Sequence, residues 1–184
     1  MPQKLTGKIA VIVGGTGGCG KSTARMMAEE GATEAEREAF RARITPTADY
    51  AKLAGCDLVI EAISERMEWK ADLYQKVAPY LGEHAIFASN TSGLSINALA
   101  AAFPENLRHR FCGVHFFNPP RYMHLVELIA CKETNPAILD NLEKFLVTTL
   151  GKGVIRARDT ANFIANRVGV FSMLATVHHA QQFG

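Results

Sequence analysis

The sequence predicts an α/β fold in which a parallel β-sheet is covered by helices on both faces. Short apolar runs rich in β-branched residues alternate along the chain with segments of helical periodicity, which is typical of strands joined by crossover helices. The 184 residues are 48% hydrophobic and 21% charged. That size and composition suit one globular domain with a short appendage.

The expected elements follow in order from the N-terminus. Strands are expected at 8–15, 56–63, 84–92, 111–120, 124–131 and 153–159. Helices are expected at 21–32, 33–44, 67–81, 96–103, 135–152 and 160–184. In the helix at 67–81, the spacing places Trp69, Leu73 and Val77 toward the core. After Gly31 the chain is polar, so the sheet lacks an evident second strand, and it ends in one long C-terminal helix.

The charge pattern favours a small-molecule ligand. The net charge is only +2, with both signs intermixed, so we expect no nucleic-acid partner and no membrane partner. Without a leader-like segment or a membrane-length apolar run, a cytoplasmic protein is expected. The four cysteines form no C-x-x-C pair, which predicts buried reduced thiols and no metal site: Cys19, Cys56, Cys112 and Cys131.

The stretch "GGTGGCGKS" at 14–22 fits two nucleotide-binding patterns. Gly15, Gly17 and Gly20 match the G-x-G-x-x-G turn of dinucleotide sites. Gly15, Gly20, Lys21 and Ser22 also match the G-x-x-x-x-G-K-[ST] pattern of an ATP-binding P-loop. A P-loop needs a later strand ending in Asp, and here that strand ends in Glu61. A dinucleotide site needs an acidic residue after a second strand, which is missing. The turn by itself leaves both alternatives open.

His115 is the candidate general base. It ends the apolar strand "CGVH", at the edge of the sheet where open α/β folds bind their ligands. Oxidation of an alcohol needs a base, and imidazole suits that role near neutral pH. Glu127, expected near the end of the neighbouring strand "HLVEL", can hold the second imidazole nitrogen and fix the tautomer.

Five ordered segments carry a family resemblance: "DLVIEAISE", "FASNTSGLSI", "GVHFFNPP", "LVELI" and "DTANFIANR". From about Thr33 onward the chain resembles the NAD-binding domain of L-3-hydroxyacyl-CoA dehydrogenases, especially those fused to an enoyl-CoA hydratase. The resemblance implies a Rossmann-like sheet, NAD as cofactor, and an acyl-CoA substrate. The implied reaction is the NAD-dependent oxidation of L-3-hydroxyacyl-CoA to 3-ketoacyl-CoA in fatty acid β-oxidation.

The resemblance also implies site residues. Ser92 and Asn166 match positions that hold the substrate oxygen, and Asn90 and Asn118 match positions beside the nicotinamide. The remaining matches surround the riboses and phosphates of the cofactor: Ala62, Glu65 and Lys70, together with Gly15, Gly17 and Gly20. Alternatively, Ser92 and Asn90 serve only as caps of the helix that starts near Leu94.

The chain departs from the family in two places. Relatives carry an insert between the equivalents of Ala32 and Thr33, and they continue past Gly184 into a helical domain. We therefore expect a dinucleotide domain at 1–160 and, at 161–184, the first helix of that second domain, with exposed apolar faces that favour a homodimer. The rival hypotheses are an inactive or binding-only dinucleotide module and a P-loop nucleotide-binding protein.

Overall fold

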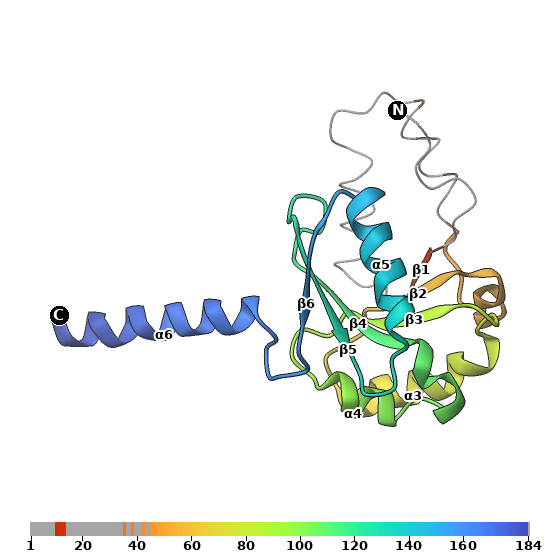
Figure 1. Cartoon of the computed structure of the whole chain (residues 1–184), viewed down its shortest axis with the longest axis horizontal. Coiled ribbons are helices and arrows are strands. Elements are labelled where there is room, and N and C mark those ends of the chain that lie inside the picture. The colour runs from red at the N-terminus through yellow and green to blue at the C-terminus, as the bar shows by residue number, and fades with distance from the viewer. Residues whose placement is uncertain (1–9, 14–34, 36–37, 39–41, 43–44, 184) are drawn as a thin grey trace.

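The computed structural model describes residues 10–13, 35, 38, 42 and 45–183, and within them a six-stranded sheet carries helices on both faces (Figure 1). The strands lie side by side in chain order: β1 (Ala10–Val13), β2 (Leu58–Glu61), β3 (Ile86–Ser89), β4 (Phe111–Phe116), β5 (Leu125–Ala130) and β6 (Gly153–Ala157). The helices are α3 (Met67–Val77), α4 (Ile96–Ala101), α5 (Pro136–Thr148) and α6 (Ala165–Phe183). The predicted fold class is confirmed. The glycine turn, the helix expected at 21–32 and most of that at 33–44 lie outside the described residues.

One strand pair corrects the expectation of a wholly parallel sheet. β1 to β4 are parallel, as are β5 and β6, but β4 and β5 are antiparallel. The connection 117–124 contains no helix and is shorter than the roughly dozen residues that a parallel crossover requires. The chain therefore returns as a hairpin, and the register sets His115 directly opposite Glu127.

Alternating side chains of the strands divide the core between the two faces. Val59, Phe87 and Phe111 pack on the side of α3 and α4. Leu58, Ala88 and Cys112 pack on the opposite side, with α5. This division follows from the period of two along a strand. At Gly113 of β4, a Cβ atom would lie 2.7 Å from Cδ1 of Ile96, so glycine permits the close approach of α4.

Helix α3 shows that the predicted position of Trp69 is wrong. The Trp69 side chain is 53% exposed, while Leu73 and Val77 are buried as predicted. The buried stripe is Lys70, Leu73, Tyr74 and Val77, which has the i, i+3, i+4, i+7 spacing of one helix face. Lys70 is therefore buried where Trp69 was expected to be. The lysine can be buried because its ammonium group has buried polar partners.

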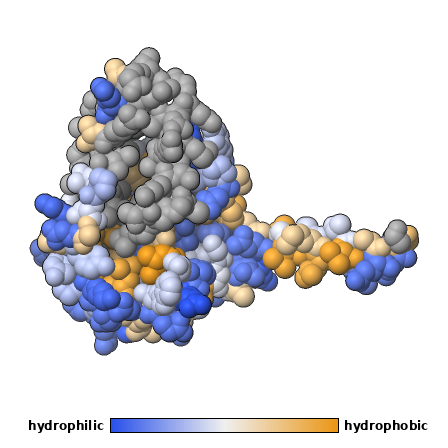
Figure 2. All heavy atoms as spheres, turned by 180° about the vertical axis from the view of Figure 1, so that it is seen from behind, coloured by the Kyte–Doolittle hydropathy of each residue, from blue (hydrophilic) through white to orange (hydrophobic). Residues whose placement is uncertain are grey.

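Helix α6 begins later than the sequence predicts. The segment from residue 160 first forms a turn in which Asn162 and Phe163 have φ angles of 61° and 50°, values that a right-handed helix excludes. The helix starts at Ala165 and extends away from the sheet (Figure 1). Figure 2 shows apolar side chains along it, with these exposed: Val168, Phe171, Met173, Leu174 and Val177. In the described part of the chain, no helix is long and apolar enough to span a bilayer.

The described cysteines are buried free thiols, as predicted for Cys56, Cys112 and Cys131. Burial raises the pKa of the Cys112 thiol to about 12. Because the thiolate is the reactive form, Cys112 is a weak nucleophile at neutral pH. Cys19 lies outside the described residues.

Candidate active site

The carboxyl ends of three parallel strands meet at one edge of the sheet. Val13, Glu61 and Ser89 end β1, β2 and β3, and they are register neighbours. The segments 62–66 and 90–93, which follow β2 and β3, therefore start side by side, at the edge where open α/β sheets bind ligands. The predicted Gly15, Gly17 and Gly20 lie outside the described residues.

His115 and Glu127 form a buried pair next to this edge. Nδ1 of His115 lies 2.8 Å from Oε2 of Glu127, and the two side chains are 4% and 0% exposed. The rings of Phe117 and Phe163 lie 4.4 and 5.6 Å from the imidazole, centroid to centroid. Across residues 45–183, Nε2 of His115 has no hydrogen-bond partner. Glu127 was expected near the end of its strand, but it lies in the first half of β5. It still faces His115 at the end of β4, because β5 runs antiparallel to β4.

The second oxygen of Glu127 reaches the last helix. Oε1 accepts hydrogen bonds from the backbone N–H groups of Ile164 and Ala165, at 3.0 and 2.9 Å. These are donors at the start of α6, where a helix leaves its first N–H groups without intrahelical partners. The pair thus joins β4, β5 and the base of α6.

Ser92 and Asn166 are brought together although 74 residues separate them in the sequence. Nδ2 of Asn166 donates to the backbone oxygen of Ser92 at 3.2 Å. The exposed Ser92 hydroxyl has no partner among the described residues. The capping alternative is wrong for both candidates: Ser95 caps α4 through the N–H of Ala98, and Oδ1 of Asn90 accepts from the N–H of Phe116 at 2.9 Å.

Glu65 joins the loops that follow β2 and β3. Its Oε1 accepts the Thr91 hydroxyl and the backbone N–H groups of Ser92 and Gly93, the latter two at 2.9 and 3.1 Å. Burial by itself raises the pKa of the Glu65 carboxyl, but the hydrogen bond from Thr91, the charge of Lys70 and the two backbone donors outweigh it and lower the pKa. Glu65 is therefore held as a carboxylate at the site edge.

Glu61 is a second buried carboxylate, and its hydrogen-bond network was not predicted from the sequence. Its Oε1 accepts from Lys70 Nζ at 2.6 Å and from the N–H of Ile63 at 2.7 Å. Its Oε2 accepts from the hydroxyls of Tyr74 and Ser89 at 3.0 and 2.7 Å. Burial, followed by the charge of Glu61, raises the pKa of Tyr74 above its ordinary value. A lysine within the apolar stripe of α3 was the sequence signal that could have revealed this partner.

The described side chains at this edge suit a dinucleotide. Asn90 uses its oxygen within the protein, and its amide N–H groups have no partner among the described residues, so they can donate to a ligand carbonyl. Oε2 of Glu65 lies 3.5 Å from Lys70, and the side chain is 43% exposed, so this oxygen can accept further hydrogen bonds. Asn118 is exposed on the hairpin loop, and Ala62 is half-buried beside β2. Lys70, in contrast, is 1% exposed, and its Nζ is bonded to Glu61.

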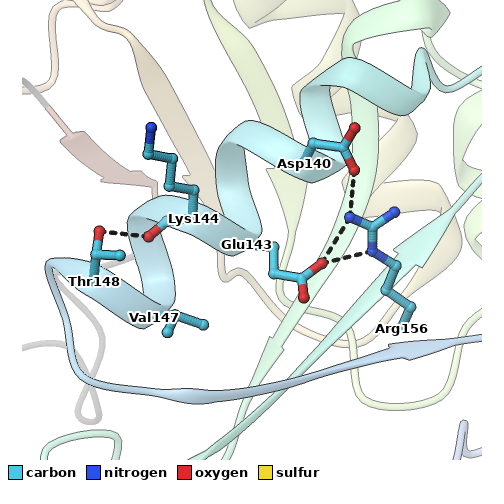
Figure 3. A pocket seen from close by; sticks show the side chains of 6 residues that line it. All are labelled: Asp140, Glu143, Lys144, Val147, Thr148 and Arg156. Carbon is cyan, nitrogen blue, oxygen red and sulfur yellow. Dashed lines mark hydrogen bonds and ion pairs between the residues drawn. The ribbon is translucent and has the colours of Figure 1, made fainter.

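A hollow lies on the face of the sheet opposite to His115. Figure 3 shows it between α5 and β6, where Arg156 contacts Asp140 and Glu143 at 2.5 and 2.7 Å. Its other lining residues are Lys144, Val147 and Thr148. The two carboxylates already neutralise the one arginine, and the sheet separates this hollow from His115. The chemistry therefore concentrates at the His115 edge.

Comparison with known families agrees with this geometry. Residues 9–160 match the family "3-hydroxyacyl-CoA dehydrogenase, NAD binding domain". The chain belongs to this family. NAD is accordingly the cofactor of the domain, and the predicted resemblance is confirmed. Because the match includes the glycine turn, it favours the dinucleotide pattern over the P-loop.

Individual relatives support the assignment. A Rickettsia prowazekii protein, assigned as the trifunctional enzyme of a fatty acid oxidation complex, is 50% identical over 125 residues, covering 68% of this chain and 17% of that protein. The mitochondrial hydroxyacyl-coenzyme A dehydrogenase of Sus scrofa is 42% identical over 121 residues, covering 66% of this chain and 38% of that protein. The chain thus spans less than half the length of either relative.

A solved structure gives the same result. The crystal structure of (S)-3-hydroxybutyryl-CoA dehydrogenase from Ralstonia eutropha is similar, with a TM-score of 0.74 and 30% sequence identity. The likeness covers 88% of this chain and 66% of that chain.

Proposed function

We propose that the protein oxidises L-3-hydroxyacyl-CoA to 3-ketoacyl-CoA with NAD, using His115 as general base and Glu127 as the residue that orients it. The observation that carries the proposal is the 2.8 Å contact between Nδ1 and Oε2, together with an Nε2 atom that has no partner in the described chain. A base is useful only if one nitrogen is held and the other can accept a proton.

The residues divide the reaction between them. With Nδ1–H donating to Glu127, the lone pair of Nε2 takes the proton of the 3-hydroxyl group, and the carboxylate stabilises the imidazolium that forms. NAD, when bound, supplies the acceptor for the hydride that leaves C3. The Ser92 hydroxyl and the Asn166 amide hold the oxygen as it becomes a ketone. Phe117 and Phe163, packed on the imidazole, keep water away from it.

The cofactor is held along the same edge. In this proposal Gly15, Gly17 and Gly20 approach the pyrophosphate, where the absence of a Cβ atom permits close backbone contact. Asn90 and Asn118 bind the nicotinamide end, and Ala62 and Glu65 line the ribose. Because its ammonium is buried, Lys70 serves by holding Glu61 and Glu65 in place rather than by touching the cofactor.

The domain division at 160/161 and the homodimer stay predictions. What supports them is the row of exposed apolar side chains on α6, including Phe171 and Leu174. We expect Phe171→Glu to weaken self-association. Sedimentation velocity over a range of concentrations tests this, and an unchanged distribution would count against an α6 interface.

The deciding experiment follows NADH consumption with acetoacetyl-CoA. His115→Gln lowers turnover by roughly 10²- to 10⁴-fold, the usual contribution of a positioned base. His84→Gln, an exposed histidine away from the site, serves as the matched control and keeps full activity. Equal activity of His115→Gln and the control would overturn the proposal.

Calorimetry separates the rival functions. NADH binding without turnover in the unmodified chain points to a binding-only module, and absence of binding points to an inactive one. Magnesium-dependent ATP binding that is lost on Lys21→Ala would instead support a P-loop protein.

A further inference from the structure

Both carboxylate oxygens of Glu127 have hydrogen-bond partners, on two different sides. One oxygen faces the imidazole of His115, and the other accepts from the N–H groups of Ile164 and Ala165. The side chain is completely buried, so these bonds replace its hydration. The N-terminal end of α6 lies against this carboxylate, so the carboxylate supplies acceptors that the first N–H groups of the helix otherwise lack.

Helix α6 has few other attachments to the sheet. None of its residues is buried. The turn before it holds Asn162 and Phe163 at positive φ, a conformation that non-glycine residues rarely adopt and that persists only when the surroundings hold it. Phe163 is buried against the imidazole, and the next two backbone N–H groups are bonded to Glu127. Packing of the Phe163 ring and the hydrogen bonds to the Glu127 carboxylate are therefore the two main interactions that fix this turn.

The held turn places Asn166 at the site. Asn166 follows Ala165 directly, and its amide reaches the backbone oxygen of Ser92 at 3.2 Å. A chain of contacts thus runs from β5 through the first turn of α6 to the loop after β3. If the base of α6 moved, Asn166 would lose its position beside Ser92.

We propose that Glu127 is a positioning residue for Asn166 as well as for His115. One carboxylate aligns the base on one side of the substrate oxygen and the hydrogen-bonding amide on the other. The kinetic part of this inference rests on the proposed function. The attachment of α6 to Glu127 does not, since it can be measured without substrate.

Two substitutions separate the two roles. In Glu127→Gln, the amide oxygen still accepts from Ile164 and Ala165, while the NH₂ group donates to Nδ1 and forces the imidazole proton onto Nε2. Turnover then falls by roughly 10⁴-fold, as expected for a reversed tautomer. In the apolar near-isostere Glu127→Met, both acceptors are lost, so the base of α6 is released as well.

Amide hydrogen exchange followed by NMR is the direct readout. We expect the Ile164 and Ala165 amides to exchange at the unmodified rate in Glu127→Gln and at least 10-fold faster in Glu127→Met. The amides of Val114 and Leu128 in the sheet report whether each variant is folded. If Glu127→Met does not fold, Glu127→Asp, one methylene shorter, replaces it and should also lose protection at both amides.

The outcomes are distinguishable. Unchanged exchange at Ile164 and Ala165 in a folded Glu127→Met or Glu127→Asp chain would overturn the inference, as would loss of protection in Glu127→Gln. Failure of the unmodified chain to consume NADH would count against the proposed function only, and would leave the exchange result valid.

Discussion

Glu61 and Glu127 are both buried glutamates on the same face of one sheet, yet their surroundings differ in kind. Glu61 is saturated by four donors that belong to the protein, including the ammonium of Lys70. Glu127 faces an imidazole whose second nitrogen has no partner among the described residues. The comparison teaches that a buried carboxylate by itself indicates a stabilising network. A buried carboxylate whose partner keeps an unoccupied hydrogen-bonding atom, as His115 does at Nε2, indicates a catalytic role.

The strongest test of this contrast removes the cation beside Glu61. Lys70→Met leaves a buried carboxylate without its counter-charge, which costs about 3–5 kcal/mol of unfolding free energy. Urea unfolding followed by circular dichroism measures the loss. Lys76→Met is the matched control, because Lys76 pairs with Asp72 on the exposed side of the same helix and should change stability far less.

A double substitution sharpens the result. Glu61→Gln combined with Lys70→Met removes both charges, and it should recover part of the stability that Lys70→Met loses. If the double variant instead loses the sum of the unfolding free energies lost by the two single variants, Glu61 and Lys70 do not act as a pair. The hydrogen-bond network of Glu61 would then not be what stabilises this part of the protein.

The next test weakens the Glu61 network without removing its charge. Tyr74→Phe deletes one donor to the carboxylate and should cost about 1.5–3 kcal/mol at neutral pH. Because burial raises the pKa of Tyr74 above its ordinary 10.0, the unfolded chain loses this proton first as the pH rises. Stability therefore falls above about pH 10, by about 1.4 kcal/mol per pH unit for this group, and that fall is absent in Tyr74→Phe. If the unfolding free energy falls equally above about pH 10 in both proteins, Tyr74 is not the cause of that fall.

A third carboxylate, Asp159, tests whether a hydrogen-bond network must be deeply buried to contribute to stability. Asp159 is only half-buried and accepts from the N–H of Ile96 and Asn97 and from the Ser95 hydroxyl. It thus joins the loop after β6 to the start of α4. Asp159→Asn replaces one of the two acceptor oxygens by an NH₂ group and should cost about 1 kcal/mol, the usual net value of a hydrogen bond.

The acid dependence of stability gives an independent check on Asp159. Burial raises the pKa of the Asp159 carboxyl, but the donors from Asn97, Ser95 and Ile96 outweigh it, so the pKa lies below its ordinary 3.8. Its contribution is therefore present above about pH 4 and is lost as the pH falls through the lowered pKa. Acid titration of unfolding should show this component in the unmodified chain and not in Asp159→Asn.

The smallest effect is expected at the exposed cluster of Arg156 and two carboxylates on the opposite face. Arg156 bridges Asp140 and Glu143 in the hollow between α5 and β6 (Figure 3). Arg156→Gln should shift the urea midpoint less than Asp159→Asn does. In 1 M NaCl, which screens the charges, the midpoints of Arg156→Gln and the unmodified chain should be equal. It should also leave NADH consumption unchanged. A loss of turnover would mean that this face contributes to the reaction.

The outline of the fold and part of the candidate site followed from sequence patterns. Apolar runs located β2 to β6, and the Asn135–Pro136 pair located the start of α5, because these signals act within a few residues. The pairing of His115 with Glu127 was also foreseen. The direction of β5, the start of α6 and the exposure of Trp69 were not, since each depends on contacts between distant segments.

By itself, the sequence determined the alternation of strands and helices, the candidate base and the family of the domain, because periodicity and motifs are written in local residue order. Only the tertiary structure decided that Glu61 binds Lys70 and that Glu127 serves both His115 and the base of α6. The physical reason is that a buried charge must find its partners in three dimensions. Those partners come from whichever segments the packed sheet brings within hydrogen-bonding distance.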